Sequence, residues 1–265
     1  DDEWAPGIYM QQAVNNVFDK ASLMSALSEF SWSSDLCLAG GILDVGNTLA
    51  LEVELKEGEA YTFVGGGDED VRDLDMFIVD RNENIIASDI EDDDTPIPDF
   101  VAPYSGRYSI RMQLISGDAP TSFVALSLLR KKGVALVEDQ YLRTSNKFFA
   151  AGGSVHSVSS GVKWHDAKNQ WCLFGVLLES KSDWTIENMF LDSADHYLFA
   201  SAGESVDNVD LKLIDDNNKV IAEDQDDDAY PILETATVSS LRYTLKITNV
   251  KSSERSLILV GIVTE

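Results

Sequence analysis

The stretch Leu74–Asp94, LDMFIVDRNENIIASDIEDDD, occurs twice in this chain, and its second copy is Val209–Ala229, VDLKLIDDNNKVIAEDQDDDA. In each copy a short run of apolar residues ends at an Asp-rich turn, a second short run follows, and a group of acidic residues closes the copy. Alternation with a period of two is typical of a half-buried strand, while Asp and Asn favour tight turns. Each copy is therefore predicted to form a β-hairpin followed by an acidic loop.

A constant offset of 135 residues, the distance from Cys37 to Cys172, relates the two copies and extends beyond the hairpin. It also maps Pro96 on Pro231 and Arg107 on Arg242. One register over such a length predicts two tandem domains of the same fold, which we place at residues 1–130 and 134–265. We expect the second domain to differ most around Trp184, where the alternating pattern is poor.

The spacing of apolar runs between polar turns determines the predicted fold class. In the first domain these runs are Leu49–Leu55, Ala60–Val64, Leu74–Val79, Ile85–Ser88, Arg107–Leu114 and Ser122–Leu129. Short strands at such intervals predict a mainly β protein made of two tandem antiparallel β-sandwich, jelly-roll-like domains. An N-terminal helix is predicted over Tyr9–Phe30, whereas its counterpart at Tyr141–Ala151 is expected to end before Gly152 and Gly153.

The charge balance limits the classes of partner. The 46 acidic and 20 basic side chains give a formal net charge of −26, which disfavours binding to nucleic acid or to an anionic membrane. No apolar run approaches the ~20 residues that cross a bilayer as a helix, so we expect no membrane insertion. The chain starts at Asp1, and we expect an exported protein that is secreted, periplasmic or at the cell surface.

The acidic loops are the candidate metal sites. Calcium takes six to eight oxygen ligands in flexible geometry, and carboxylates at alternate positions of a loop can supply several of them. Crowding such carboxylates together without a cation would raise their pKa values. A calcium site (Ca2+) and a merely solvated loop both remain open as interpretations. The candidate ligands are Asp75, Asp89, Glu91, Asp92 and Asp93 in the first copy, and Asp210, Asp224, Asp226, Asp227 and Asp228 in the second.

A family resemblance follows from the order of four segments: LEVELKEGEAYTFV, DLDMFIVDRNENIIASD, the acidic run, and FVAPYSGRYSIRM. This order resembles the bacterial pre-peptidase C-terminal (PPC) domain over about Leu49–Arg130, and more loosely over Trp184–Glu265, where the Pro and Gly of the last segment are missing. The resemblance implies a jelly-roll-like sandwich, a secreted setting and an accessory binding role. It also favours calcium, because some collagen-binding relatives carry that ion.

Other residue types yield weaker alternatives. A carbohydrate-binding module could present tryptophan rings, although core packing is the favoured use of these side chains, which are Trp4, Trp32, Trp164, Trp171 and Trp184. A secreted hydrolase would place its site in the second domain near His156 and His165. Cys37 and Cys172 are expected to be buried thiols. The alternative interpretation is that they form a disulfide between the two domains.

The preferred hypothesis is a non-catalytic exported protein that is stabilised by calcium at its acidic loops. We expect its partner to be an extracellular protein or polysaccharide, or further copies of the chain in a self-assembly. The Asp-rich turns at Asp80 and Asp215 are interpreted as purely structural, because Asp side chains bond back to the turn backbone.

Overall fold

The computed structural model describes residues 7–158, 161–166 and 170–265. The chain is mainly β, with antiparallel sheets and two long helices, and it divides into two compact units. The N-terminal unit consists of Tyr9–Ser33 and Cys37–Ala135, and the C-terminal unit consists mainly of Leu136–Glu265. Trp4 and Ala167–Asn169 lie outside the described residues.

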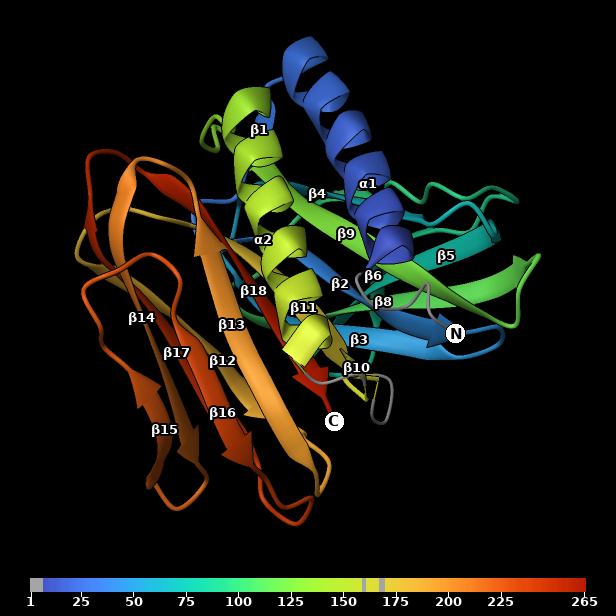
Figure 1. Cartoon of the computed structure of the whole chain (residues 1–265). Helices are drawn as coiled ribbons and strands as arrows, with labels where there is room; N and C mark the ends of the chain where they lie inside the picture. Colours follow the sequence, from blue (N-terminus) through green and yellow to red (C-terminus); the bar gives the residue numbers. More distant parts are fainter. Residues whose placement is uncertain (1–6, 159–160, 167–169) are drawn as a thin grey trace. The chain divides into compact units, whose positions relative to one another are not determined.

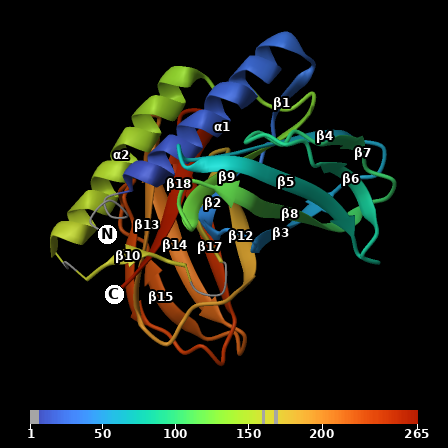
Figure 2. The ribbon, with the colours of Figure 1, turned by 90° about the vertical axis from the view of Figure 1, so that its right-hand side faces the viewer.

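The N-terminal unit holds two antiparallel sheets. The first has the order β2-β9-β4-β7, with β1 also paired to β9, and the second has the order β3-β8-β5-β6. Figure 2 shows the strands of the second sheet following one another from β3 to β6. The bounds are β1 (Phe30–Trp32), β2 (Leu36–Asp44), β3 (Thr48–Leu55), β4 (Ala60–Gly67), β5 (Val71–Asp80), β6 (Ile85–Asp89), β7 (Asp99–Val101), β8 (Gly106–Gly117) and β9 (Thr121–Lys131).

The C-terminal unit repeats this arrangement. Its first sheet has the order β16-β13-β18-β11, with β10 also paired to β18, and its second has the order β12-β17-β14-β15. The bounds are β10 (Lys163–Trp164), β11 (Trp171–Leu178), β12 (Ser182–Met189), β13 (Asp195–Ala202), β14 (Val206–Asp215), β15 (Val220–Asp224), β16 (Ile232–Ala236), β17 (Tyr243–Ser252) and β18 (Ser256–Thr264). Two antiparallel sheets in a unit agree with the predicted β-sandwich.

The repeat register is visible in the strand bounds. Strands β4, β5 and β6 start and end 135 residues before β13, β14 and β15. The region around Trp184 is the predicted exception: the pairing of β12 with β17 shifts between Ile186 and Met189, and Asn188 has a φ of 58°. The second copy therefore keeps the sheet and adds a bulge to one edge strand.

A helix covers the first sheet of each unit. Helix α1 (Ile8–Leu27) buries Met10, Val14 and Val17 on one face, and Val17 approaches Gly66 of β4 so closely that a Cβ there would lie 3.0 Å from it. On the other face of β4, a Cβ at Gly65 would lie 2.8 Å from the Met76 side chain of the second sheet. The glycines of β4 thus let the helix and the second sheet approach the same strand from both sides.

Helix α2 (Glu138–Val158) corrects the expectation of a short helix ended by glycine, because it continues through Gly152 and Gly153. Each glycine costs a helix about 1 kcal/mol relative to alanine. Packing offsets this cost, because Phe148 on the same helix stacks against aromatic rings of the sheet. Its ring centroid lies 5.1 Å from that of Phe199 and 5.7 Å from that of Trp164. In Figure 1 the helix lies along β13 and β18, within the C-terminal unit. Tertiary contacts therefore override the local propensity.

Candidate functional site

The two acidic loops have the same internal hydrogen bonds. Asp89 accepts the backbone N–H groups of Glu91 and Ile97 at 3.3 and 2.8 Å, and Asp224 accepts those of Asp226 and Ile232 at 3.1 and 2.9 Å. We call this pattern the aspartate clasp. Because it joins the end of β6 or β15 to the segment entering β7 or β16, it fixes the path of the chain between the two sheets of a unit.

A second acid closes each loop. Asp93 and Asp228 each accept a backbone N–H from two residues further on, both at 2.7 Å. Their own carbonyl oxygens accept the N–H groups of Leu74 and Val209 at 2.9 and 2.8 Å. Four of the ten predicted calcium ligands therefore bond to their own loop backbone.

The remaining predicted ligands divide between exposed loop positions and the strands. Glu91, Asp92, Asp226 and Asp227 are exposed, whereas Asp75 and Asp210 are half-buried on β5 and β14. Partial burial, together with the charges of Asp73 and Asp89, raises the pKa of the Asp75 carboxyl. Partial burial and the charge of Asp224 do the same to the pKa of Asp210. Within the described ranges, no group of three or more His, Cys, Asp or Glu side chains is arranged to hold a metal ion, and calcium stays a prediction.

The two loops differ at one pair of positions. In the C-terminal unit the Asn208 amide donates to the Asp227 carboxylate at 3.2 Å. The N-terminal unit has Asp73 in place of Asn208 and Asp92 in place of Asp227. Burial and the charges of Asp92 and Asp93 raise the pKa of Asp73. The first loop thus has two carboxylates near each other where the second has a hydrogen bond.

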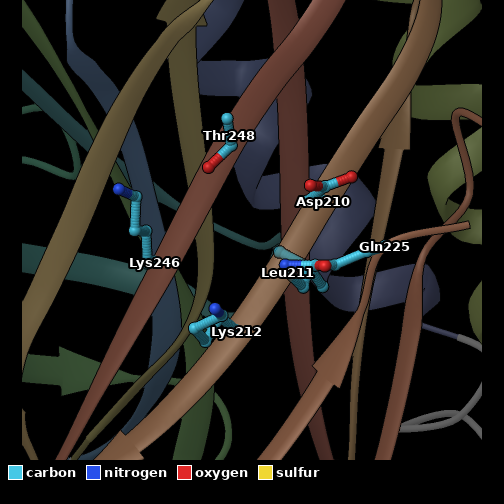
Figure 3. A pocket seen from close by; sticks show the side chains of 6 residues that line it. All are labelled: Asp210, Leu211, Lys212, Gln225, Lys246 and Thr248. Carbon is cyan, nitrogen blue, oxygen red and sulfur yellow. The ribbon is translucent and has the colours of Figure 1, made fainter. Parts of the chain in front are cut away.

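A hollow of about 130 Å³ lies on the outer face of the β12-β17-β14-β15 sheet (Figure 3). It is lined by Asp210, Leu211, Lys212, Gln225, Lys246 and Thr248. In the pairing of β14 with β17, Asp210 lies opposite Thr248 and Lys212 lies opposite Lys246. Sequence reasoning identified only Asp210 among these residues, because strand alternation marks an outward position without indicating what its neighbours across the sheet are.

Ion pairs hold the two lysines of the hollow. Lys212 Nζ lies 2.9 Å from Glu223 Oε2 on β15, and Lys246 pairs with Asp183 on β12. Two like charges directly opposite each other in a sheet are destabilising, and these carboxylates offset that repulsion. Asp210 Oδ1 is buried and has no hydrogen-bond partner within the part of the chain that the structure describes. The hollow is therefore lined by two ammonium donors and by the carboxylate of Asp210.

Of the two histidines predicted near a hydrolase site, His156 is half-buried on α2 and His165 is buried. A third histidine, His196, is also buried, with its ring centroid 5.3 Å from that of His165. His165 Nε2 is 3.1 Å from the Phe190 carbonyl oxygen and Nδ1 is 3.2 Å from the Thr264 hydroxyl. Burial, and then the neighbouring His196, lowers the pKa of His165 to about 4. A neutral imidazole with both nitrogens engaged inside the core is a structural group.

The Asp-rich turns behave as interpreted from sequence. Asp80 Oδ1 accepts the backbone N–H groups of Asn82 and Asn84 at 2.7 and 2.8 Å, and Asp215 Oδ1 accepts those of Asn217 and Lys219 at 2.9 Å each. Hydrogen bonds to its carboxylate lower the pKa of Asp80 to about 2, and the bond from the Asn84 side chain has the largest effect. These turns shape the hairpins.

Tryptophan and cysteine also take core roles. Trp32, Trp164 and Trp171 are buried, which confirms core packing for these three, and Trp184 is half-buried. Cys37 and Cys172 are buried thiols, as predicted, and burial raises the pKa of each. No helix among the described residues is long and apolar enough to cross a membrane.

The comparisons with known proteins do not identify a family. No protein-family model and no curated protein matches the chain. Solved structures with similar segments include the periplasmic g-type lysozyme inhibitor PliG of Aeromonas hydrophila, at 15% identity over 37% of this chain and 86% of that one, with a TM-score of 0.29.

Two further solved structures are described as carbohydrate-binding modules. The tandem CBM22 domains of Paenibacillus barcinonensis Xyn10C match at 8% identity over 89% of this chain and 99% of theirs, with a TM-score of 0.23. The xylan-binding module CBM86 from Roseburia intestinalis matches at 11% identity over 40% of this chain and 83% of its own, with a TM-score of 0.23. With all TM-scores far below 0.5, these similarities carry no functional argument.

Proposed function

We propose that this chain is a non-catalytic, exported binding protein that engages an extracellular macromolecule through the outer face of the β12-β17-β14-β15 sheet. The observation that carries the proposal is the hollow on that face, which is lined by the polar side chains of Asp210, Lys212, Gln225, Lys246 and Thr248. A few polar groups that converge on a hollow can fix the orientation of a bound molecule and provide specificity.

The rigidity of the surroundings supports a binding role. The hollow is built on adjacent strands, and its floor residue Leu211 is fully buried. Lys212 and Lys246 are held in place by ion pairs to neighbouring strands. Sites carried on strands are more precisely positioned than sites on loops, which lowers the entropy lost when a ligand binds.

Depletion of the protein from solution by insoluble extracellular polymers tests this proposal. The panel contains cellulose, xylan, pectin, chitin and collagen. Thr248→Arg places a long side chain in the hollow, and Gln113→Arg makes the same change at the register-matched position of the N-terminal unit. We expect at least one polymer to retain the wild type and Gln113→Arg but not Thr248→Arg. Retention of no polymer, or equal retention of both variants, would refute the proposal.

A further inference from the structure

The chemistry of the hollow narrows the ligand class. Asp210 can only accept hydrogen bonds when ionised, whereas Lys212 and Lys246 can only donate. Gln225 and Thr248 do both. A ligand that satisfies all of these groups must offer donors and acceptors within a short distance of one another, and a hydroxyl group offers both from a single atom.

Charge and hydrogen-bonding capacity together disfavour an ionic ligand. Four carboxylates surround the two ammonium groups, because Asp183 and Glu223 pair with the lysines and Asp224 lies near Asp210. An anion entering the hollow would meet this excess of negative charge in a chain whose formal charge is already −26. An ammonium cation offers only donors, so it would provide no acceptor for the lysines. A neutral group with hydroxyls offers both donors and acceptors.

Size sets a second limit. Pockets that enclose a drug-sized ligand start at roughly 300 Å³, whereas this hollow measures about 130 Å³. It can therefore receive one ring of a larger molecule, with the rest of the ligand continuing across the sheet. None of the six described lining residues is aromatic, so recognition depends on hydrogen bonds and not on stacking of a ring against a side chain.

Resting on the proposed binding function, we infer that the hollow binds one uncharged sugar ring of a polysaccharide, with adjacent hydroxyl groups donating to Asp210 and accepting from Lys246, Lys212 or Gln225. The N-terminal unit cannot bind in this way. At the matched positions it has Phe77 for Lys212, Arg111 for Lys246 and Ile90 for Gln225. Arg111 is moreover paired with Glu83 at 2.7 Å.

The test is a titration of the full chain followed by amide chemical shifts in NMR spectra. The probes are xylotriose and maltotriose as neutral sugars, digalacturonate as an anionic sugar and the glucosamine dimer as a cationic one. We expect a neutral probe to shift the amides of β14 and β17 around the hollow, with weak affinity because one ring makes few contacts. The charged probes should bind that site at least about tenfold less tightly.

Three conservative variants test the named contacts. Asp210→Asn removes the acceptor-only carboxylate and Thr248→Val removes the hydroxyl while keeping the shape, so each should weaken the neutral probe at least about tenfold, as expected for a site that uses hydrogen bonds to recognise hydroxyl groups. Asp75→Asn, the register-matched change, should leave binding unaltered. Unchanged melting of the variants would show that the loss is local.

The outcomes separate the inference from the function on which it rests. If a charged probe shifts the hollow more strongly than the neutral ones, the ligand class is wrong and the binding function stands. The same holds if a polymer is retained through the hollow but neither neutral probe shifts it. If no polymer is retained in the depletion assay, the binding function itself fails.

Discussion

The N-terminal and C-terminal units have the same arrangement of strands and differ in the side chains on those strands. Both have the aspartate clasp, with bonds that agree to within a few tenths of an ångström. Across the outer face of the second sheet, however, Phe77 and Arg111 in one unit stand where Lys212 and Lys246 stand in the other. The comparison shows that residues setting the chain path recur, while residues facing solvent on the sheet have diverged into different chemistry.

Acidification should produce the largest contrast between the units. The C-terminal unit buries His165 and His196, where the N-terminal unit has Phe30 and Tyr61. The folded pKa of His165, about 4, lies below its unfolded value near 6.5. The unfolded chain therefore binds protons first, and stability is lost as pH falls from about 6.5 to 4, by roughly 3 kcal/mol.

Hydrogen exchange measured between pH 7 and 4 checks this expectation. Protection of β13 and β18 should fall relative to that of β4 and β9. A His165→Phe variant carries the residue type of the matched position, Phe30. In this variant the protection of the C-terminal unit should depend less on pH. A C-terminal unit that is equally stable at both pH values would show that the histidines are solvated or protonated when folded.

Acidification should have the opposite effect on the stability of the N-terminal unit, because of Asp68. This carboxylate is buried and accepts the Phe123 and Asp70 N–H groups at 2.8 and 3.1 Å, while burial raises its pKa to about 6. Because the folded pKa exceeds the unfolded value, the charged form costs stability above pH 6. That cost disappears as pH falls toward 4, so this group stabilises the unit on acidification.

An Asp68→Asn variant measures the contribution. Its N-terminal unit should lose the gain in hydrogen-exchange protection between pH 6 and 4, while the C-terminal unit keeps the dependence of the wild type. The matched residue of that unit is Gly203, so no equivalent group titrates there. Identical pH profiles for the variant and the wild type would contradict the assignment.

Removing the aspartate of the clasp should lower the free energy of unfolding of each unit by a similar amount. Asp89→Ala and Asp224→Ala each leave two backbone N–H groups without their carboxylate partner. Since the loops reach solvent, we expect a loss of about 1–2 kcal/mol per variant, seen as a lower melting temperature. Glu91→Ala, which removes an exposed side chain that takes no part in the clasp, is the control and should change stability by less than about 0.5 kcal/mol. A large difference between the two clasp variants would mean that the units do not share this support.

The smallest expected effect concerns the predicted calcium. Asp73→Asn gives the first loop the amide of the second, and should stabilise the N-terminal unit by about 0.5 kcal/mol without cations through a hydrogen bond to Asp92. In millimolar calcium the wild type should gain stability over its state in chelator, and the variant should gain less, because a bound ion stabilises the native state alone. Equal melting in calcium and chelator would remove the metal hypothesis.

The sequence was informative where local chemistry determines structure. The period of two at Leu49–Leu55, the Asp turns and the offset of 135 residues lead directly to strands, hairpins and the repeat. It misled at Gly152 and Gly153, where the packing of Phe148 outweighs helix propensity. The hollow could not be predicted from the sequence, because Lys212, Gln225 and Lys246 come together only through the pairing of separate strands.

The aspartate clasp also fixes a length. Asp89 to Ile97 and Asp224 to Ile232 are each eight residues apart, and the carboxylate spans both ends of that interval. One residue more or fewer would move the accepting N–H away from its aspartate. These acidic segments, although exposed and polar, are thus poor places for insertions or affinity tags, in contrast to what surface loops usually tolerate.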